Sequence, residues 1–463
     1  RQLGALGSDQ WQALTTAQLR DLSTEQIANL ATDDLASLTS TQLAAFTTAQ
    51  LAAMTTGQLA ALDSTDISSL TTAQIRSLGT SDVMALDSTD FAGLSTAQVA
   101  AFATNQLRAI ETNDLAALTT DGLAAISTAG IAALTSRQIG ALGSDQLQAL
   151  NTNQLRALSS EQLAGLGTED IVALTSDQFA LLGTEQIVAL STAQVAAMDS
   201  TDVAALSTKQ IRAMETRDIV ALDSQDVAGL TTTQVVALSS EQLRAMETAD
   251  LAAMATASIA AMSTTGISAF TTRQIVALSS DQINALSSTQ VRALATDQLA
   301  GLATEDLNGL GTAQIAALST EQLVALTTLQ ISALESEDLA ALSTKQIRAL
   351  ETSDIVALDS ADFAALSSVQ VAALTNDQLR AIETADLAAM ATAGLAVLAT
   401  DAISGFSTKQ LGALGSDQWQ ALTTAQVRSL TTAQVAGMTT EDVAALTTDQ
   451  LAALSTEQIV AMT

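Results

Sequence analysis

Large apolar residues recur along this chain at two places in every eight, three residues apart. From Gly7 to Met462 the same octad is repeated 57 times without an insertion or deletion, and Ser23–Leu30 is a representative copy. The fifth and eighth places are apolar, the fourth is usually Gln or Asp, and the second is Ser or Thr except at Asn376. A fixed period of this kind predicts a solenoid or another repeat array.

The pattern excludes two of three secondary structures. The fifth and eighth places have opposite parity, as Ile27 and Leu30 do, so a β-strand would put them on opposite faces. In one continuous α-helix the apolar stripe would drift by about 80° per octad, more than supercoiling absorbs. A short helix in every octad remains, because Ser and Thr are good N-caps and acids such as Glu169 and Asp170 fall in the first turn. We therefore predict helices of five or six residues, each capped by the second-place residue.

No octad of this size is expected to be stable alone, because two buried side chains do not offset the entropy lost by eight ordered residues. Stability must come from stacked neighbours. The small seventh residue is expected to let successive helices approach closely, and the fourth-place Gln or Asp to reach backbone groups of the next repeat. The predicted fold class is all-α, a solenoid or superhelix of capped mini-helices with one helix per octad.

A second period of 136 residues, or 17 octads, lies over the first. Arg108–Asp114 recurs as Arg244–Asp250 and again as Arg380–Asp386. Because 17 is odd, duplicating such a block would exchange the two roles of a two-layer α-α solenoid, so we expect equivalent octads in a spring or tube. No linker interrupts the chain, which predicts one continuous array over residues 1–463. Its blocks are 7–142, 143–278, 279–414 and the partial block 415–463.

Composition excludes several classes of function. The net charge is −32, from 17 basic and 49 acidic residues, and such a surface repels phosphate backbones and anionic lipids. No apolar run approaches the about 20 residues of a membrane-spanning helix. The chain has no Cys and no His, so disulfides and thiolate or imidazole metal sites are absent. We expect no nucleic-acid binding and no membrane insertion.

Paired carboxylates three residues apart are the strongest candidates for a metal site. Oxygen ligands of this kind suit Ca²⁺, but the sequence has no EF-hand loop, and capping of helix starts explains the acids without a metal. We predict no cofactor, with Ca²⁺ as the weaker alternative. The candidate residues are Asp63, Asp66, Asp87, Asp90, Asp199, Asp202, Asp223, Asp226, Asp359 and Asp362.

Other recurrent features have structural explanations. Arginines and glutamates three residues apart are expected to form surface ion pairs; the pairs are Arg108–Glu111, Arg212–Glu215, Arg244–Glu247, Arg348–Glu351 and Arg380–Glu383. Trp11 and Trp419 occupy apolar fifth places and are expected in the core. Two octads per block lack the fourth-place Gln or Asp, which indicates either copied drift or a recurrent docking point or bend. They carry Gly122 and Gly130, Ser258 and Gly266, and Gly394 and Ala402.

The amino-acid sequence of the repeat also resembles that of a known family. Leu14–Leu19 reads Leu-Thr-Thr-Ala-Gln-Leu and Leu22–Ile27 reads Leu-Ser-Thr-Glu-Gln-Ile. This register resembles the octapeptide (LTTAQ-type) repeat arrays of very large bacterial surface or secreted proteins, over essentially the whole chain. The resemblance implies an extracellular or cell-surface setting in a bacterium, with an adhesin as one context.

These observations predict a structural protein that forms an extracellular filament, sheath or stalk and assembles with itself, head to tail or laterally. The chain opens inside an octad and ends one residue into another, so no capping repeat is expected at either end. Every Ser and Asp has many equivalents, which predicts that the protein is not an enzyme. The alternative is a repetitive binding or adhesion module that engages a periodic polysaccharide, mineral, ice or protein partner. The variable third and sixth places favour the structural role, and an acidic nucleic-acid mimic would rest on charge alone.

Overall fold

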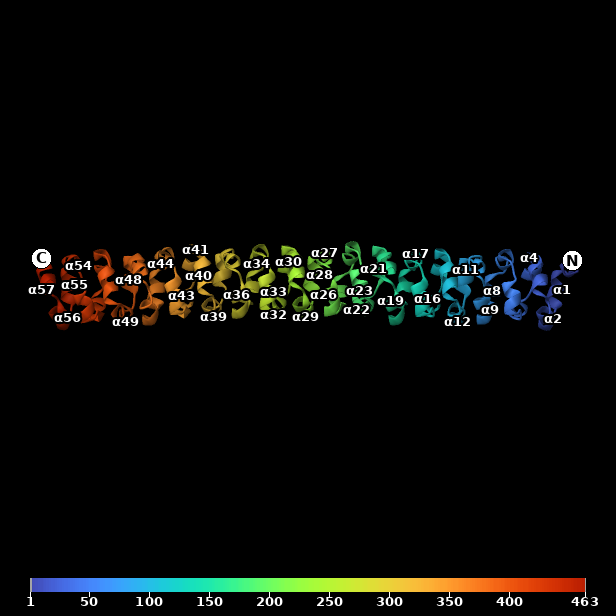
Figure 1. Cartoon of the computed structure of the whole chain (residues 1–463), viewed down its shortest axis with the longest axis horizontal. Coiled ribbons are helices and arrows are strands. Elements are labelled where there is room, and N and C mark those ends of the chain that lie inside the picture. The colour runs from blue at the N-terminus through green and yellow to red at the C-terminus, as the bar shows by residue number, and fades with distance from the viewer. Residues whose placement is uncertain (1, 463) are drawn as a thin grey trace. The chain divides into compact units, whose positions relative to one another are not determined.

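The computed structural model describes residues 2–462 as a succession of short helices with no strand among them. After a 3-10 turn, η1 (Leu3–Ala5), there are 57 α-helices, one for each octad (Figure 1). Helix αn begins at residue 8n, the second place of its octad, so α1 is Ser8–Ala13 and α57 is Thr456–Ala461. The predicted fold class is therefore confirmed.

The helices are four to six residues long. The four-residue helices are α7, α10, α12, α17, α24, α46 and α51. The five-residue helices are α2 to α6, α15, α18, α20, α23, α34, α35, α37, α38, α39, α41, α49, α53 and α54, and all the others have six residues.

The helix caps lie one residue earlier than the sequence predicts. In α2 (Thr16–Arg20) the N-cap is first-place Thr15, whose hydroxyl accepts from the Gln18 backbone N–H at 3.3 Å, while second-place Thr16 is already helical. Gln18 Oε1 in turn accepts from the Thr15 N–H at 2.9 Å and completes a capping box. The prediction of a second-place cap was wrong because the fourth-place Gln closes this box only when it is the third helical residue.

Each helix ends because two residues in a row are extended. Eighth-place Leu14 has φ −68° and ψ 134°, and first-place Thr15 has φ −72° and ψ 155°. The Leu14 N–H still bonds to Trp11 O at 3.2 Å, so the last turn closes tightly before the chain leaves it. A continuous helix is thereby broken once per octad.

Helices pack mainly on the helix three octads away, not on their neighbour in sequence. The contact between α11 (Ser88–Gly93) and α14 (Thr112–Ala117) is typical. Fifth-place side chains such as Leu115 are fully buried, and eighth-place side chains such as Leu118 are nearly so. Together they form the core.

The small seventh residue has a different neighbour from the one that the sequence predicts. A Cβ at Gly165 would lie 2.8 Å from Cβ of Ser136, the second-place residue three octads earlier. Close approach is therefore a contact between superhelical turns and not between successive helices.

The chain divides into two units, Arg1–Ala237 and Leu238–Thr463. The same contacts, between octads three apart, recur within each unit (Figure 1). The prediction of a single continuous array over residues 1–463 stays a prediction.

Candidate functional site

The fourth-place glutamine joins octads that are distant in sequence. In α20 (Ser160–Ala164), Gln162 Oε1 accepts from the Ser159 N–H at 2.7 Å. Its Nε2 donates to Ile131 O at 2.9 Å and Leu134 O at 2.8 Å, at the end of α16 (Thr128–Ala133). One carboxamide thus caps the start of its own helix and the carbonyl end of a helix four octads earlier.

This bond recurs along both units and forms a ladder that we call the glutamine ladder, the set of fourth-place glutamines that donate to carbonyls four octads earlier. Gln50 donates to Leu19 O and Leu22 O, and Gln426 to Leu395 O and Leu398 O, at 2.8 to 2.9 Å. Gln50 and Gln426 are each only 2% exposed, so their satisfied amides are part of the core. A ladder was predicted, but its partner is not the next repeat.

A fourth-place aspartate makes a different bond, because it is shorter and has no N–H to donate. Asp66 Oδ1 accepts from the Ser40 hydroxyl at 3.2 Å, and Asp362 Oδ1 accepts from the Ser336 hydroxyl at 2.9 Å. Each hydroxyl belongs to the second place of the octad three earlier. That hydroxyl was predicted to cap its own helix, and its bond to an aspartate three octads later was not predicted. The 26-residue spacing between Ser and Asp is the feature of the sequence that matches this bond.

The predicted calcium candidates are brought together as capping pairs. Asp87 Oδ1 accepts from the N–H groups of Thr89 and Asp90 at 2.8 and 3.1 Å, and Asp90 Oδ2 accepts from the Asp87 N–H at 3.0 Å. The pairs at Asp199/Asp202, Asp223/Asp226 and Asp359/Asp362 repeat this arrangement, while Asp63 caps the Asp66 N–H at 2.9 Å. Residues 2–462 contain no group of three or more potential metal-ligating side chains. Ca²⁺ binding stays a prediction.

Burial raises the pKa of several fourth-place aspartates. For Asp90, burial is the largest cause, and the charges of Asp87 and Asp63 add to it. The pKa values of Asp66, Asp202, Asp226 and Asp362 are raised in the same way, with burial first. Asp66, Asp90 and Asp114 lie at intervals of three octads, on helices that pack on one another. We call such a series stacked aspartates.

The predicted arginine–glutamate pairs are not the ion pairs found among residues 2–462. Arg380 lies 3.5 Å from Asp377, and Arg217 lies 2.9 Å from Glu215 and 3.7 Å from Asp218. The sixth-place side chain instead reaches forward to the octad three later, where Arg244 Nε donates to Ala269 O at 2.9 Å. For Arg244 and Arg380 the acceptor is thus a carbonyl near the end of a helix and not the predicted glutamate.

The tryptophans lie in the core, and one of the octads without Gln or Asp has close packing at its fourth place. Trp11 and Trp419 are fully buried, as predicted, and Trp419 Nε1 donates to Asp442 Oδ1 at 3.0 Å. Gly130 lets turns approach closely, since a Cβ there would lie 2.7 Å from Leu107 Cδ1 and 2.6 Å from Ile126 Cγ2. That these octads serve as a docking point or bend stays a prediction.

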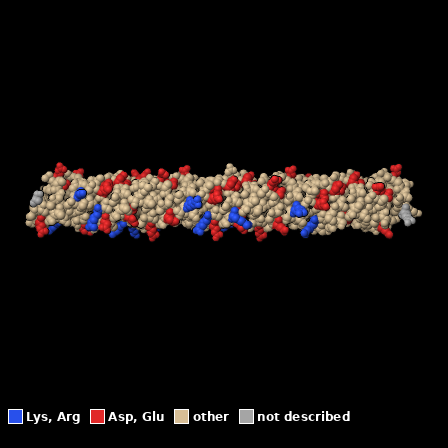
Figure 2. Space-filling model, turned by 90° about the horizontal axis from the view of Figure 1, so that it is seen from above, with Lys and Arg blue, Asp and Glu red and all other residues tan. Residues whose placement is uncertain are grey.

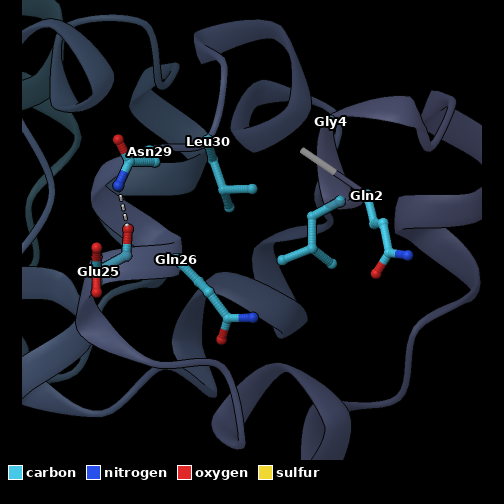
Figure 3. Close-up of a pocket in the computed structure, with 7 residues that line it drawn as sticks. Gln2, Gly4, Glu25, Gln26, Asn29 and Leu30 are labelled. Atoms are coloured by element: carbon cyan, nitrogen blue, oxygen red, sulfur yellow. Dashed lines mark hydrogen bonds between the residues drawn. The ribbon is translucent and has the colours of Figure 1, made fainter.

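The surface has one sizeable hollow near the start of the described residues. It has a volume of about 570 Å³ and is lined by Gln2, Leu3, Gly4, Glu25, Gln26, Asn29 and Leu30. Figure 3 shows Glu25 and Asn29 on one side and Gln2 on the other, with Asn29 Nδ2 donating to Glu25 O at 2.7 Å. Among the described residues of this lining, Glu25 is the single ionisable group.

Two further findings concern the class of protein. In the described chain, no helix is both long enough and apolar enough to cross a lipid bilayer. The equivalent mini-helices and their bonds between turns define an all-α repeat protein of the solenoid class.

The family is shown by comparison. A family model described as "ALTTAQ repeat" matches in overlapping segments that together cover residues 3–96 and 107–448. The chain therefore belongs to the ALTTAQ repeat family, which confirms the resemblance to LTTAQ-type arrays.

Comparisons with individual proteins add no further assignment. A search of curated proteins finds no match. Two solved structures, "APUM23-GGAUUUGACGG" and "APUM23-GGAAUUGACGG", align at 11% identity over 95% of this chain and 92% of theirs. Their TM-scores are 0.15 and 0.14, so this likeness carries no argument.

Proposed function

We propose that this chain is a structural protein, a repetitive acidic superhelix that builds an extracellular filament, sheath or stalk of a bacterium. The observation that carries the proposal is the glutamine ladder. Its donor face and its acceptor face differ, and an octad with a fourth-place Gln can use both: octad 159–166 donates to the octad four earlier and accepts from the octad four later. A heterologous contact that does not close on itself extends without limit, which is the geometry of a filament.

The sameness of the octads supports a role without catalysis. Fourth-place Asp and Gln residues occupy equivalent positions, and the Ser hydroxyl to Asp bond recurs in several octads of the described chain. An active site needs one constellation distinguished from the rest of the molecule. The extracellular and bacterial setting is part of the proposal and rests on the resemblance of the repeats to surface and secreted arrays.

Electron microscopy of the purified chain over a series of concentrations tests this function. We expect fibres longer than a single chain, with a regular axial repeat. Parallel grids prepared with about 1 mM CaCl₂ or with EDTA test whether Ca²⁺ promotes fibre formation. Discrete rods of one length that never join, at any concentration, would contradict the filament and favour a spacer or a binding arm.

A further inference from the structure

The number of octads in one superhelical turn is bracketed by the contacts. Helices pack on the helix three octads away, and glutamine side chains bond four octads away, so a turn contains between three and four octads. Within these limits the 17-octad block spans a whole number of turns only if that number is five, which corresponds to about 3.4 octads per turn. If the block spans five turns, residues of one unit that are one block apart lie on the same side of the superhelix.

Sixth-place arginines follow this geometry closely. Seven of the ten sixth-place arginines do so: Arg20, Arg76, Arg156 and Arg212 in the first unit, and Arg292, Arg348 and Arg428 in the second. Arg108, Arg244 and Arg380 lie off this spacing. Within each unit the spacings of these seven residues alternate between 56 and 80 residues, or seven and ten octads. At about 3.4 octads per turn, these spacings are close to two and three whole turns, within about 20° of one side. We call these seven residues the arginine row.

The arginine row is exposed and not neutralised. Arg20, Arg76 and Arg156 each donate through Nε to the seventh-place carbonyl three octads later, at 2.8, 3.4 and 3.2 Å. These bonds hold the side chains on the surface, and all seven residues are exposed. None of the seven forms an ion pair within residues 2–462, although the chain carries 49 carboxylates.

Acidic octads lie on other sides of the superhelix with the same period. Exposed Asp63, Asp87 and Glu111 begin octads six, nine and twelve places after that of Arg20, which puts them about a quarter to half a turn away from the row. Glu335, Asp359 and Glu383 are their equivalents in the second unit. Figure 2 shows one face of the surface, on which Asp and Glu side chains are numerous and Lys and Arg side chains are few. We call these acidic octads the acidic face.

We propose that a second copy of this chain docks laterally, with the arginine row of one copy on the acidic face of the next. Charge complementarity favours the contact, and the shared period lets successive residues of the row within one unit engage in the same way. Each exposed pair is weak, but several pairs on one rigid partner add through multivalency. The proposal rests on the structural function proposed above and specifies how filaments bundle.

Lateral association depends on ionic strength, because two chains of net charge −32 repel each other at long range. At about 0.15 M salt the screening length is about 8 Å, which suppresses that repulsion more than contact pairs. We therefore expect lateral association near this salt concentration and its loss at about 1 M.

The test compares the native chain with two variants of equal charge. The row variant carries R20Q, R76Q, R156Q and R212Q, and the control carries R108Q, R137Q, R244Q and R273Q. Glutamine keeps the Nε bond, since Gln12 and Gln148 already donate from the sixth place to Ser37 O and Ala173 O at 3.0 and 2.9 Å. Circular dichroism checks that both variants remain helical.

Sedimentation and electron microscopy at about 0.15 and 1 M NaCl give the readout. We expect side-by-side bundles of the native chain, a shift of the row variant to at least about tenfold higher protein concentration, and little change in the control. Equal loss in both variants, or native chains that stay single, would overturn the proposal. So would capture of a sulfated polysaccharide by the row without association of copies. Bundled short rods would support lateral docking and contradict end-to-end filaments. Single long fibres would support end-to-end filaments and contradict lateral docking.

Discussion

At the scale of single residues, the fourth place decides how one octad is joined to the rest. A glutamine there serves as acceptor for its own helix start and as donor to another helix end, and it does both while buried. An aspartate keeps the first role and loses the second. One substitution separates these roles.

Changing Gln162 to Glu keeps the acceptor for the Ser159 N–H but removes the donor to Ile131 O and Leu134 O. We expect the local opening free energy of α16 and α20 to fall by about 1–3 kcal/mol, because two buried carbonyls lose their partner. Hydrogen exchange of the amides in these helices measures this. Glu161→Gln, at the exposed neighbouring place, is the control; unchanged exchange in Q162E would contradict the role of the ladder.

The stacked aspartates predict stability that rises toward acid pH. Their folded-state pKa lies above the unfolded value of 3.8, so the folded chain binds protons first as pH falls, and the free energy of unfolding increases. The gain accrues between the raised folded pKa and about 3.8, and it is complete below that value. Asp90→Asn is expected to stabilise the chain at pH 7 and to reduce its gain at pH 4. Thermal melts at both values, with exposed Asp121→Asn as the control, test this; greater stability at pH 7 than at pH 4 would count against it.

At the scale of the helix, the position of the cap fixes where each element starts. Ser159 accepts from the Gln162 N–H at 3.2 Å, whereas Ser160 is the first helical residue. We expect Ser159→Ala to cost about 1 kcal/mol and Ser160→Ala to cost little. Hydrogen exchange within α20 distinguishes the two serines, and an equal effect would favour the second-place cap that the sequence alone suggested.

Two helical glycines differ in the space that a methyl group would find beside them. A Cβ at Gly57, in the third place of α7 (Thr56–Leu59), meets no atom within 4 Å, whereas at Gly130 it would contact Leu107 Cδ1 and Ile126 Cγ2. We expect Gly57→Ala to stabilise its helix by about 0.4–1 kcal/mol. Gly130→Ala should destabilise by about 1–3 kcal/mol through overpacking. Urea unfolding of the two variants gives the sign, and stabilisation by G130A would show that the turns can separate there without cost.

At the scale of the whole molecule, stability is a sum over equivalent octads and their contacts between turns. Removing residues 159–166, one complete octad, is expected to leave the chain folded, because every later octad finds an equivalent partner three and four places back. Removing residues 159–162, half an octad, puts the apolar fifth and eighth places out of register. Circular dichroism and limited proteolysis compare the two deletions. If both are equally disruptive, the octads are not interchangeable.

Much of this architecture is local and could be predicted. The eight-residue period, the helix in each octad, the burial of Ile27 and Leu30 and of both tryptophans, and the acids in the first turn all follow from spacing and side-chain chemistry. The cap was misplaced by one residue, because both the first and second places carry good capping residues and only the bond made by the fourth-place glutamine distinguishes them.

What the sequence by itself determined is the list of interacting groups in each octad and their period. Only the tertiary structure decided their partners: the octad three away for packing and for sixth-place arginines, and the octad four away for glutamine. The physical reason is that local spacing sets which face of a mini-helix is apolar, while the number of octads per turn depends on how far consecutive turns must approach to bury the core. The distance between turns sets which carbonyls the glutamine amide reaches, and the sequence of a single octad does not determine that distance.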